Sequence, residues 1–217
     1  MIKFERFQII CHRGYWDSHS FPPNSLESFS RAFENGYGVE TDIRNIAESI
    51  IIGHDIVDKK CTFTDFLQAY SSFKFSANNP SSLLLNIKAD GLAASIANLL
   101  DEFQVQQYFC FDMSVPESLS YEKHNLNHLV RFSEYEDNAM LVRSMNPSGI
   151  WVDSFHGRYY DIETLIHFID VAPNFFIVSP ELHKRPITDD YLEWLERLYG
   201  KIGNALKVCT DVPEFYI

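Results

Sequence analysis

The 217-residue sequence contains no long apolar run. No stretch approaches the about 18 consecutive apolar residues that a membrane-spanning helix needs. Residues 1–10 interrupt a short apolar stretch with charged side chains, and they lack the long apolar core and small-residue cleavage site of a signal peptide. We therefore expect no membrane span and a cytoplasmic location.

Basic residues are also scarce. The chain has 18 Lys and Arg against 30 Asp and Glu, which gives a formal net charge of −12. Such an acidic balance disfavours non-specific binding to nucleic acids and to anionic membrane surfaces. We expect no nucleic-acid partner, and an anionic substrate would have to be held by a few well-placed cations.

The four cysteines follow no zinc-binding spacing. They lie far apart in the sequence, and three of them sit within apolar runs: Cys11, Cys110 and Cys209. Small apolar side chains in such runs are typical of a protein core. We expect Cys61 and these three residues to be free thiols, which agrees with the interior of a cell.

No linker, low-complexity stretch or internal repeat divides the chain, so we expect one domain over residues 1–217. Short runs rich in Val, Ile, Phe and Leu recur without strict alternation, as in strands that are buried on both faces. The strands predicted in this way are Phe7–His12, Gly38–Asp42, Leu83–Lys88, Tyr108–Asp112, Leu129–Arg131, Gly149–Asp153, Phe175–Ser179 and Leu206–Asp211.

Apolar residues at helical spacing lie between these strands. The first predicted helix carries Leu26, Phe29 and Phe33, with Asn24 and Glu27 as a capping box and Gly36 as its stop. Further helices are predicted around 62–70, 92–100, 162–169 and 192–198, with weaker signals at 116–122 and 134–143. Eight strands that alternate with helices imply a parallel sheet, and they favour a (β/α)8 TIM barrel over an open doubly wound sheet.

Polar and ionisable residues gather where the first predicted strands end. These residues are His12 and Arg13, Glu40 and Asp42, His54 and Asp55, and Asn86 with Lys88. In a barrel, the carboxyl ends of the strands form the face on which active sites are built.

Several of these residues also have plain structural interpretations. His12 and Arg13 could simply end a strand, His54 and Asp55 could form a turn, and Asn24 could serve only as a helix cap. Glu40 and Asp42 are harder to explain in this way. They lie two residues apart, so on a strand they point to the same side, where two buried carboxylates repel each other without a cation. Oxygen ligands suit a hard divalent cation such as Mg²⁺ or Ca²⁺.

The combination of motifs is more specific than any one of them. His-Arg-Gly at 12–14, Pro-Pro-Asn-Ser at 22–25, Glu-Thr-Asp at 40–42 and Gly-His-Asp at 53–55 follow one another in the first quarter of the chain. In this order, the sequence resembles the glycerophosphodiester phosphodiesterase family of barrel enzymes. Weaker similarity continues at 84–88, at 110–112 and at 209–213.

The resemblance implies roles for seven residues. His12 and His54 would carry out acid–base catalysis, Arg13 and Lys88 would lie near the phosphate, and Glu40 and Asp42 would bind a divalent cation. The third strand of the family usually carries Glu-x-Lys, and its Glu is a metal ligand. Here Asn86 takes that place, so a neutral oxygen replaces a charged one.

Two further departures accompany the change at Asn86. Pro23 stands where the family usually has Glu, and the family's inserted segment after His-Asp is almost absent. Because Asn86 brings no charge, the metal site would be weaker or would need another ligand, for which Asp112 and Asp153 are candidates.

The sequence thus predicts a metal-dependent phosphoric diester hydrolase that acts on a small-molecule phosphodiester. The alternative is a degenerate barrel that binds a phosphorylated ligand without catalysis. A barrel enzyme of other chemistry, such as a lyase acting on a phosphodiester headgroup, is a third hypothesis.

Overall fold

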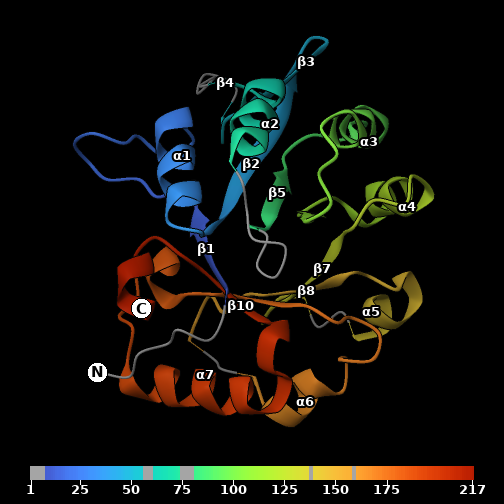
Figure 1. Ribbon diagram of the computed structural model, residues 1–217. Helices are drawn as coiled ribbons and strands as arrows, with labels where there is room; N and C mark the ends of the chain where they lie inside the picture. The colour runs from blue at the N-terminus through green and yellow to red at the C-terminus, as the bar shows by residue number, and fades with distance from the viewer. Residues whose placement is uncertain (1–7, 56–60, 74–80, 137–138, 158–159) are drawn as a thin grey trace. The chain divides into compact units, whose positions relative to one another are not determined.

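The computed structural model describes residues 8–55, 61–73, 81–136, 139–157 and 160–217. It divides into two compact units (Figure 1). Ile10–His128 form the first unit, and Leu129–Ile217 with Gln8 and Ile9 form the second. Phe7, at which the first strand was predicted to begin, lies outside the described residues.

Four parallel strands form the sheet of the first unit. β1 (Gln8–His12) pairs with β2 (Gly38–Ile46), β2 pairs with β5 (Leu83–Ile87), and β5 pairs with β6 (Tyr108–Phe111). The register aligns His12 with Glu40 and Asn86 with Asp42. Because the strands are parallel, their carboxyl ends meet at one edge and bring these four residues together.

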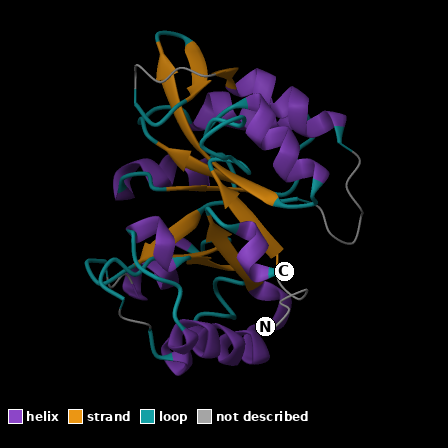
Figure 2. Cartoon of the chain, turned by 90° about the vertical axis from the view of Figure 1, so that its left-hand side faces the viewer, coloured by secondary structure: helices purple, strands orange, loops and turns teal. Residues whose placement is uncertain are grey.

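The second strand is longer than predicted. We expected it to end at Asp42, but β2 continues to Ile46 and turns into the antiparallel strands β3 (Ser49–Ile52) and β4 (Cys61–Thr62). Figure 2 shows this extension as a long hairpin. The prediction stopped too early because Arg44 and Asn45 do not fit a strand buried on both faces, whereas a hairpin can leave one face in solvent.

Among the described residues of this unit, α1 (Leu26–Glu34), α2 (Phe63–Ser72) and α3 (Ala93–Glu102) lie between its strands, and α4 (Val115–Lys123) follows β6. α1 and α2 lie side by side (Figure 1). The Phe29 ring lies 4.7 Å from the Phe66 ring, and Phe33 lies 5.4 Å from Tyr70. Edge-to-face pairs of this kind stabilise packing beyond the area that they bury.

The predicted cap of α1 is wrong by one residue. Asn24 adopts a left-handed φ of 56°, whereas an N-cap residue normally has an extended backbone. Ser25, with a φ of −117°, caps the helix and forms a capping box with Ser28. The Asn24 side chain therefore does not cap α1 and can make a different contact.

The second unit also contains four parallel strands, which pair in chain order: β7 (Leu129–Phe132), β8 (Gly149–Val152), β9 (Phe175–Val178) and β10 (Leu206–Thr210). Its helices are α5 (Ala139–Met145), α6 (Ile162–Ile166) and α7 (Asp189–Ile202), and a short 3-10 helix, Pro180–His183, follows β9. Of the helix predicted over Glu134–Arg143, residues 137–138 lie outside the described residues, α5 covers the part from Ala139, and Ser133 and Glu136 form a bridged turn before it. All eight predicted strands are confirmed.

The four cysteines are buried and free, as predicted. Burial raises the pKa of the Cys61 thiol to about 12 and also raises that of Cys110. Among the residues that the structure describes, no helix is both long and apolar enough to cross a membrane.

Candidate active site

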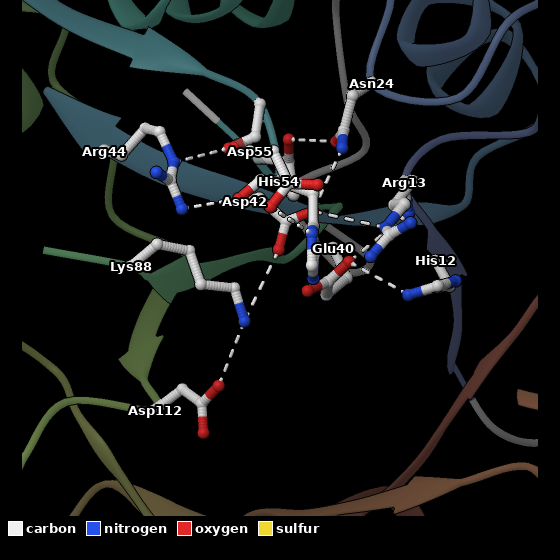
Figure 3. A network of polar contacts seen from close by, with 12 residues as sticks. His12, Arg13, Asn24, Glu40, Asp42, Arg44, His54, Asp55, Lys88 and Asp112 are labelled. Carbon is white, nitrogen blue, oxygen red and sulfur yellow. Dashed lines mark hydrogen bonds and ion pairs between the residues drawn. The ribbon is translucent and has the colours of Figure 1, made fainter. Parts of the chain in front are cut away.

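The two carboxylates predicted to bind a metal lie side by side on β2. Figure 3 shows Glu40 and Asp42 among the polar contacts at this strand, and burial leaves each of them only 1 % exposed. Three loops are tied to this strand by backbone hydrogen bonds. The amide groups of Arg13, Gly53 and Lys88 donate to the carbonyl oxygens of Glu40, Asp42 and Ile43, at 2.8, 3.0 and 2.8 Å. β2 therefore positions the three other motifs around its own acidic pair.

The His-Arg-Gly turn depends on its glycine. Gly14 has a φ of 86°, and a Cβ atom there would lie 2.5 Å from the Ser28 Oγ. Only glycine fits such a conformation at this distance. The turn places the Arg13 amide 3.3 Å from the Glu40 Oε2, and the His12 Nε2 lies 3.9 Å from the same oxygen.

Cations of the chain itself surround Asp42. The Arg13 Nε lies 3.2 Å from Oδ2, and the Lys88 Nζ lies 3.6 Å from Oδ1. Lys88 also reaches the Asp112 Oδ2 at 3.1 Å. Two buried carboxylates would be costly alone, and the two cations offset that cost. Because Arg13 and Lys88 remain partly exposed, they can also meet an incoming anion.

The pKa of Glu40 is raised, and burial is the largest cause. The imidazole of His12 acts in the opposite direction, and the Asp42 carboxylate raises the pKa further. Lys88 and Arg13 have smaller, lowering effects. A cation placed between the carboxylates would favour their charged forms and remove this penalty.

Asn24 is a site residue that the sequence analysis missed. Its Nδ2 donates to the Asp42 Oδ2 at 3.0 Å, and its Oδ1 accepts from the Thr41 Oγ1 at 2.8 Å. The side chain is buried and fixes the orientation of Asp42. Its place in a Pro-Pro-Asn-Ser motif was the available signal, but the sequence favoured a helix cap.

His54 stands apart from these contacts. Its side chain is 47 % exposed, and its Nδ1 lies 3.4 Å from the Asp55 Oδ1. Among the described residues, its ring makes no ion pair or hydrogen bond with Glu40 or Asp42. The backbone is held by Arg44, which the sequence analysis also missed and which donates to the carbonyl oxygens of Gly53 and His54 at 3.1 and 2.5 Å. The Arg44 guanidinium thus fixes the backbone from which the His54 imidazole extends.

A divalent cation fits this arrangement, although the described residues contain no cluster of three His, Cys, Asp or Glu side chains for one. The supporting observation is the Asn86 Oδ1, which is buried and has no hydrogen-bond partner among those residues. Asn86 is the register partner of Asp42. The two carboxylates and this amide oxygen are ligands that hard cations accept.

The two alternative ligands make other contacts. Asp112 is paired with Lys88 in the first unit. Asp153 lies in the second unit, where it contacts His183 and Arg131. Lys88 thus links Asp112 to Asp42 of the acidic pair, whereas these contacts of Asp153 lie within the second unit.

No known protein-family model and no curated protein matches the sequence. Solved structures do match it. A putative glycerophosphodiester phosphodiesterase from Galdieria sulphuraria is 14 % identical, with a TM-score of 0.76 over 97 % of this chain and 96 % of the other. An Oleispira antarctica phosphodiesterase in complex with the product sn-glycerol-3-phosphate is 16 % identical, with a TM-score of 0.69 over 96 % and 94 % of the two chains.

The tryptophan synthase A-subunit from Pyrococcus furiosus also matches, at 12 % identity and a TM-score of 0.52 over 99 % and 91 % of the two chains. Similarity at such identities shows a shared fold, because one barrel fold supports many chemistries. The predicted (β/α)8 TIM barrel is thus confirmed, and the chain is similar over nearly its whole length to glycerophosphodiester phosphodiesterases.

Proposed function

We propose that this protein is a metal-dependent phosphoric diester hydrolase, similar to glycerophosphodiester phosphodiesterases, which cleaves a small-molecule phosphodiester. The observation that carries the proposal is the buried Glu40–Asp42 pair, bordered by His12, Arg13 and Lys88. The fold shared with a phosphodiesterase crystallised with sn-glycerol-3-phosphate supports it.

Arg13 and Lys88 are the phosphate-binding residues of the proposal. In the structure they pair with Asp42, and a phosphodiester would compete for the same two cations. Their partly exposed positions allow them to turn from Asp42 to the non-bridging oxygens. An arginine can do so with two parallel hydrogen bonds, which also orients the phosphate.

Glu40, Asp42 and Asn86 would hold the divalent cation, either Mg²⁺ or Ca²⁺. When bound, such a cation neutralises charge that develops on a phosphate. Glu40 has a second role toward His12, because its Oε2 faces the Nε2 of that imidazole. A carboxylate in this place can orient the imidazole as a proton carrier.

His12 and His54 are the proposed acid–base pair. One imidazole would take a proton from the attacking water or hydroxyl group, and the other would protonate the leaving alkoxide. His12 is held against Glu40, whereas His54 extends from the backbone that Arg44 fixes. The attacking group and the leaving group would thus each exchange a proton with a different imidazole.

The test is turnover of bis(p-nitrophenyl) phosphate and of glycerophosphodiesters by His12→Ala and His54→Ala. General acid–base catalysis contributes about 10²–10⁴-fold, so each variant is expected to lose at least two orders of magnitude in kcat. His19→Ala is the matched control, because His19 is an exposed histidine of the same unit. Full activity in His12→Ala would refute its role, and a cyclic phosphate product would indicate a lyase instead.

Binding without catalysis is the second candidate function, and Asn86 is the observation that favours it. A neutral amide in place of a charged ligand weakens the site that activates phosphate. Under this alternative, calorimetry would detect a phosphorylated ligand, whereas the wild-type protein would release no product. We further propose that residues 1–217 act as a single domain and that the four free thiols reflect a cytoplasmic location.

A further inference from the structure

A second polar cluster lies at the strand ends of the second unit. Asp153 follows β8 and is only 5 % exposed. His183, in the 3-10 helix after β9, places its Nε2 2.5 Å from the Asp153 Oδ1. The Arg131 Nη1, from β7, lies 3.7 Å from Oδ2. The proposed phosphodiesterase function uses none of these residues.

The buried carboxylate orients the imidazole. An ionised Asp153 can only accept, so the Nε2 of His183 carries a proton toward it, and in the neutral ring the Nδ1 is an acceptor. His183 makes no other hydrogen bond among the described residues, and its side chain is 20 % exposed. The arrangement presents a fixed acceptor that can take a hydrogen bond from a hydroxyl group.

Aromatic rings continue the cluster toward the solvent. The Phe155 ring lies 4.7 Å from His183, and the Tyr135 ring lies 5.6 Å from Phe155. Tyr135 is 69 % exposed, and its hydroxyl group contacts the His156 Nε2 at 2.5 Å. Glu134 accepts from the backbone amides of Phe155 and His156, at 2.9 and 3.0 Å. The rings are therefore held in place before any ligand arrives.

Charge selects the ligand class. Arg131 lies between Asp153 and Glu136, with its Nε 3.4 Å from the Glu136 Oε2. Its cation repels a cationic ligand, and the two carboxylates repel an anionic one. A neutral ligand with an apolar face and several hydroxyl groups can use both the aromatic rings and the acceptor nitrogen.

We propose that Tyr135, Phe155 and the Asp153–His183 pair form a binding site for a neutral polyhydroxylated ring, a sugar or a cyclitol. The C–H face of the ring packs on the two aromatic side chains. One of its hydroxyl groups donates to the Nδ1 of His183. The proposal does not depend on catalysis in the first unit.

Glucose, myo-inositol and glycerol are suitable probes, followed by saturation-transfer NMR and calorimetry on the full chain. We expect glucose or myo-inositol to bind with a Kd of about 1 mM or tighter, and glycerol, which has no ring, to bind at least tenfold more weakly. Tyr135→Ala and His183→Gln should each weaken binding at least tenfold. Tyr135 is so exposed that its removal leaves the fold intact.

The controls separate this site from the proposed active site. His12→Ala should lose turnover and bind the probes as the wild type does. The proposal is overturned if neither ring compound binds, or if Tyr135→Ala binds them unchanged. If His183→Gln changed the melting temperature without changing the affinity for the ring compounds, the Asp153–His183 pair would be only structural.

Discussion

Replacing Asn86 by Asp tests the metal site without relying on activity. The substitution keeps the side-chain shape and adds a third carboxylate beside Asp42, its register partner on the neighbouring strand. Neighbouring strands lie about 5 Å apart. Two unit charges at that distance repel by about 3 kcal/mol at an effective dielectric constant of about 20.

Arg13 and Lys88 offset part of this repulsion. We therefore expect the metal-free variant to lose about 1–3 kcal/mol of unfolding free energy, which lowers the melting temperature by about 2–12 °C for a chain of this size. In saturating Mg²⁺ or Ca²⁺, Asn86→Asp should instead be more stable than the wild type. The added charge then attracts the cation, and affinity should rise at least tenfold, or about 1.4 kcal/mol.

The assay is thermal unfolding in EDTA and in excess Mg²⁺ or Ca²⁺, with calorimetric titration of each ion. Asn125→Asp, an exposed site at the end of α4, is the matched control and should respond to neither ion. If Asn86→Asp melts like the wild type in EDTA and neither protein gains stability from either ion, the assignment of a cation to Glu40, Asp42 and Asn86 is refuted.

Three further predictions concern single residues. Asn24→Ala leaves Asp42 and Thr41 without a buried hydrogen-bond partner and should cost about 1–3 kcal/mol, measured by urea unfolding, with a lower kcat. Lys88→Gln should raise KM for bis(p-nitrophenyl) phosphate at least tenfold, and an unchanged KM would contradict phosphate binding by Lys88. Burial lowers the pKa of His128 in the folded protein, so on acidification the unfolded chain binds a proton at this residue before the folded chain does. The free energy of unfolding should therefore fall below about pH 6.5, by up to about 1.4 kcal/mol per pH unit. His128→Gln should reduce that slope.

The structure also explains which expectations could be read from the sequence. Strands buried on both faces are nearly continuous apolar runs, and this is why runs such as Phe175–Val178 were identified within one residue of their ends. The hairpin beyond Asp42 was not identified, because its second strand is held by pairing with β2 rather than by burial on both faces. The cap of α1 was misplaced because the sequence does not reveal the left-handed backbone of Asn24.

By itself, the sequence determined the barrel class, the eight strands and the acidic pair on β2, since apolar runs and a spacing of two residues follow from local geometry. Only the tertiary structure decided which side chains meet. The contact of Asn24 with Asp42 joins residues 18 positions apart, and that of His183 with Asp153 joins residues 30 positions apart. Such contacts depend on the path of the whole chain, because strand pairing and loop conformation, rather than sequence spacing, bring those atoms within hydrogen-bond distance.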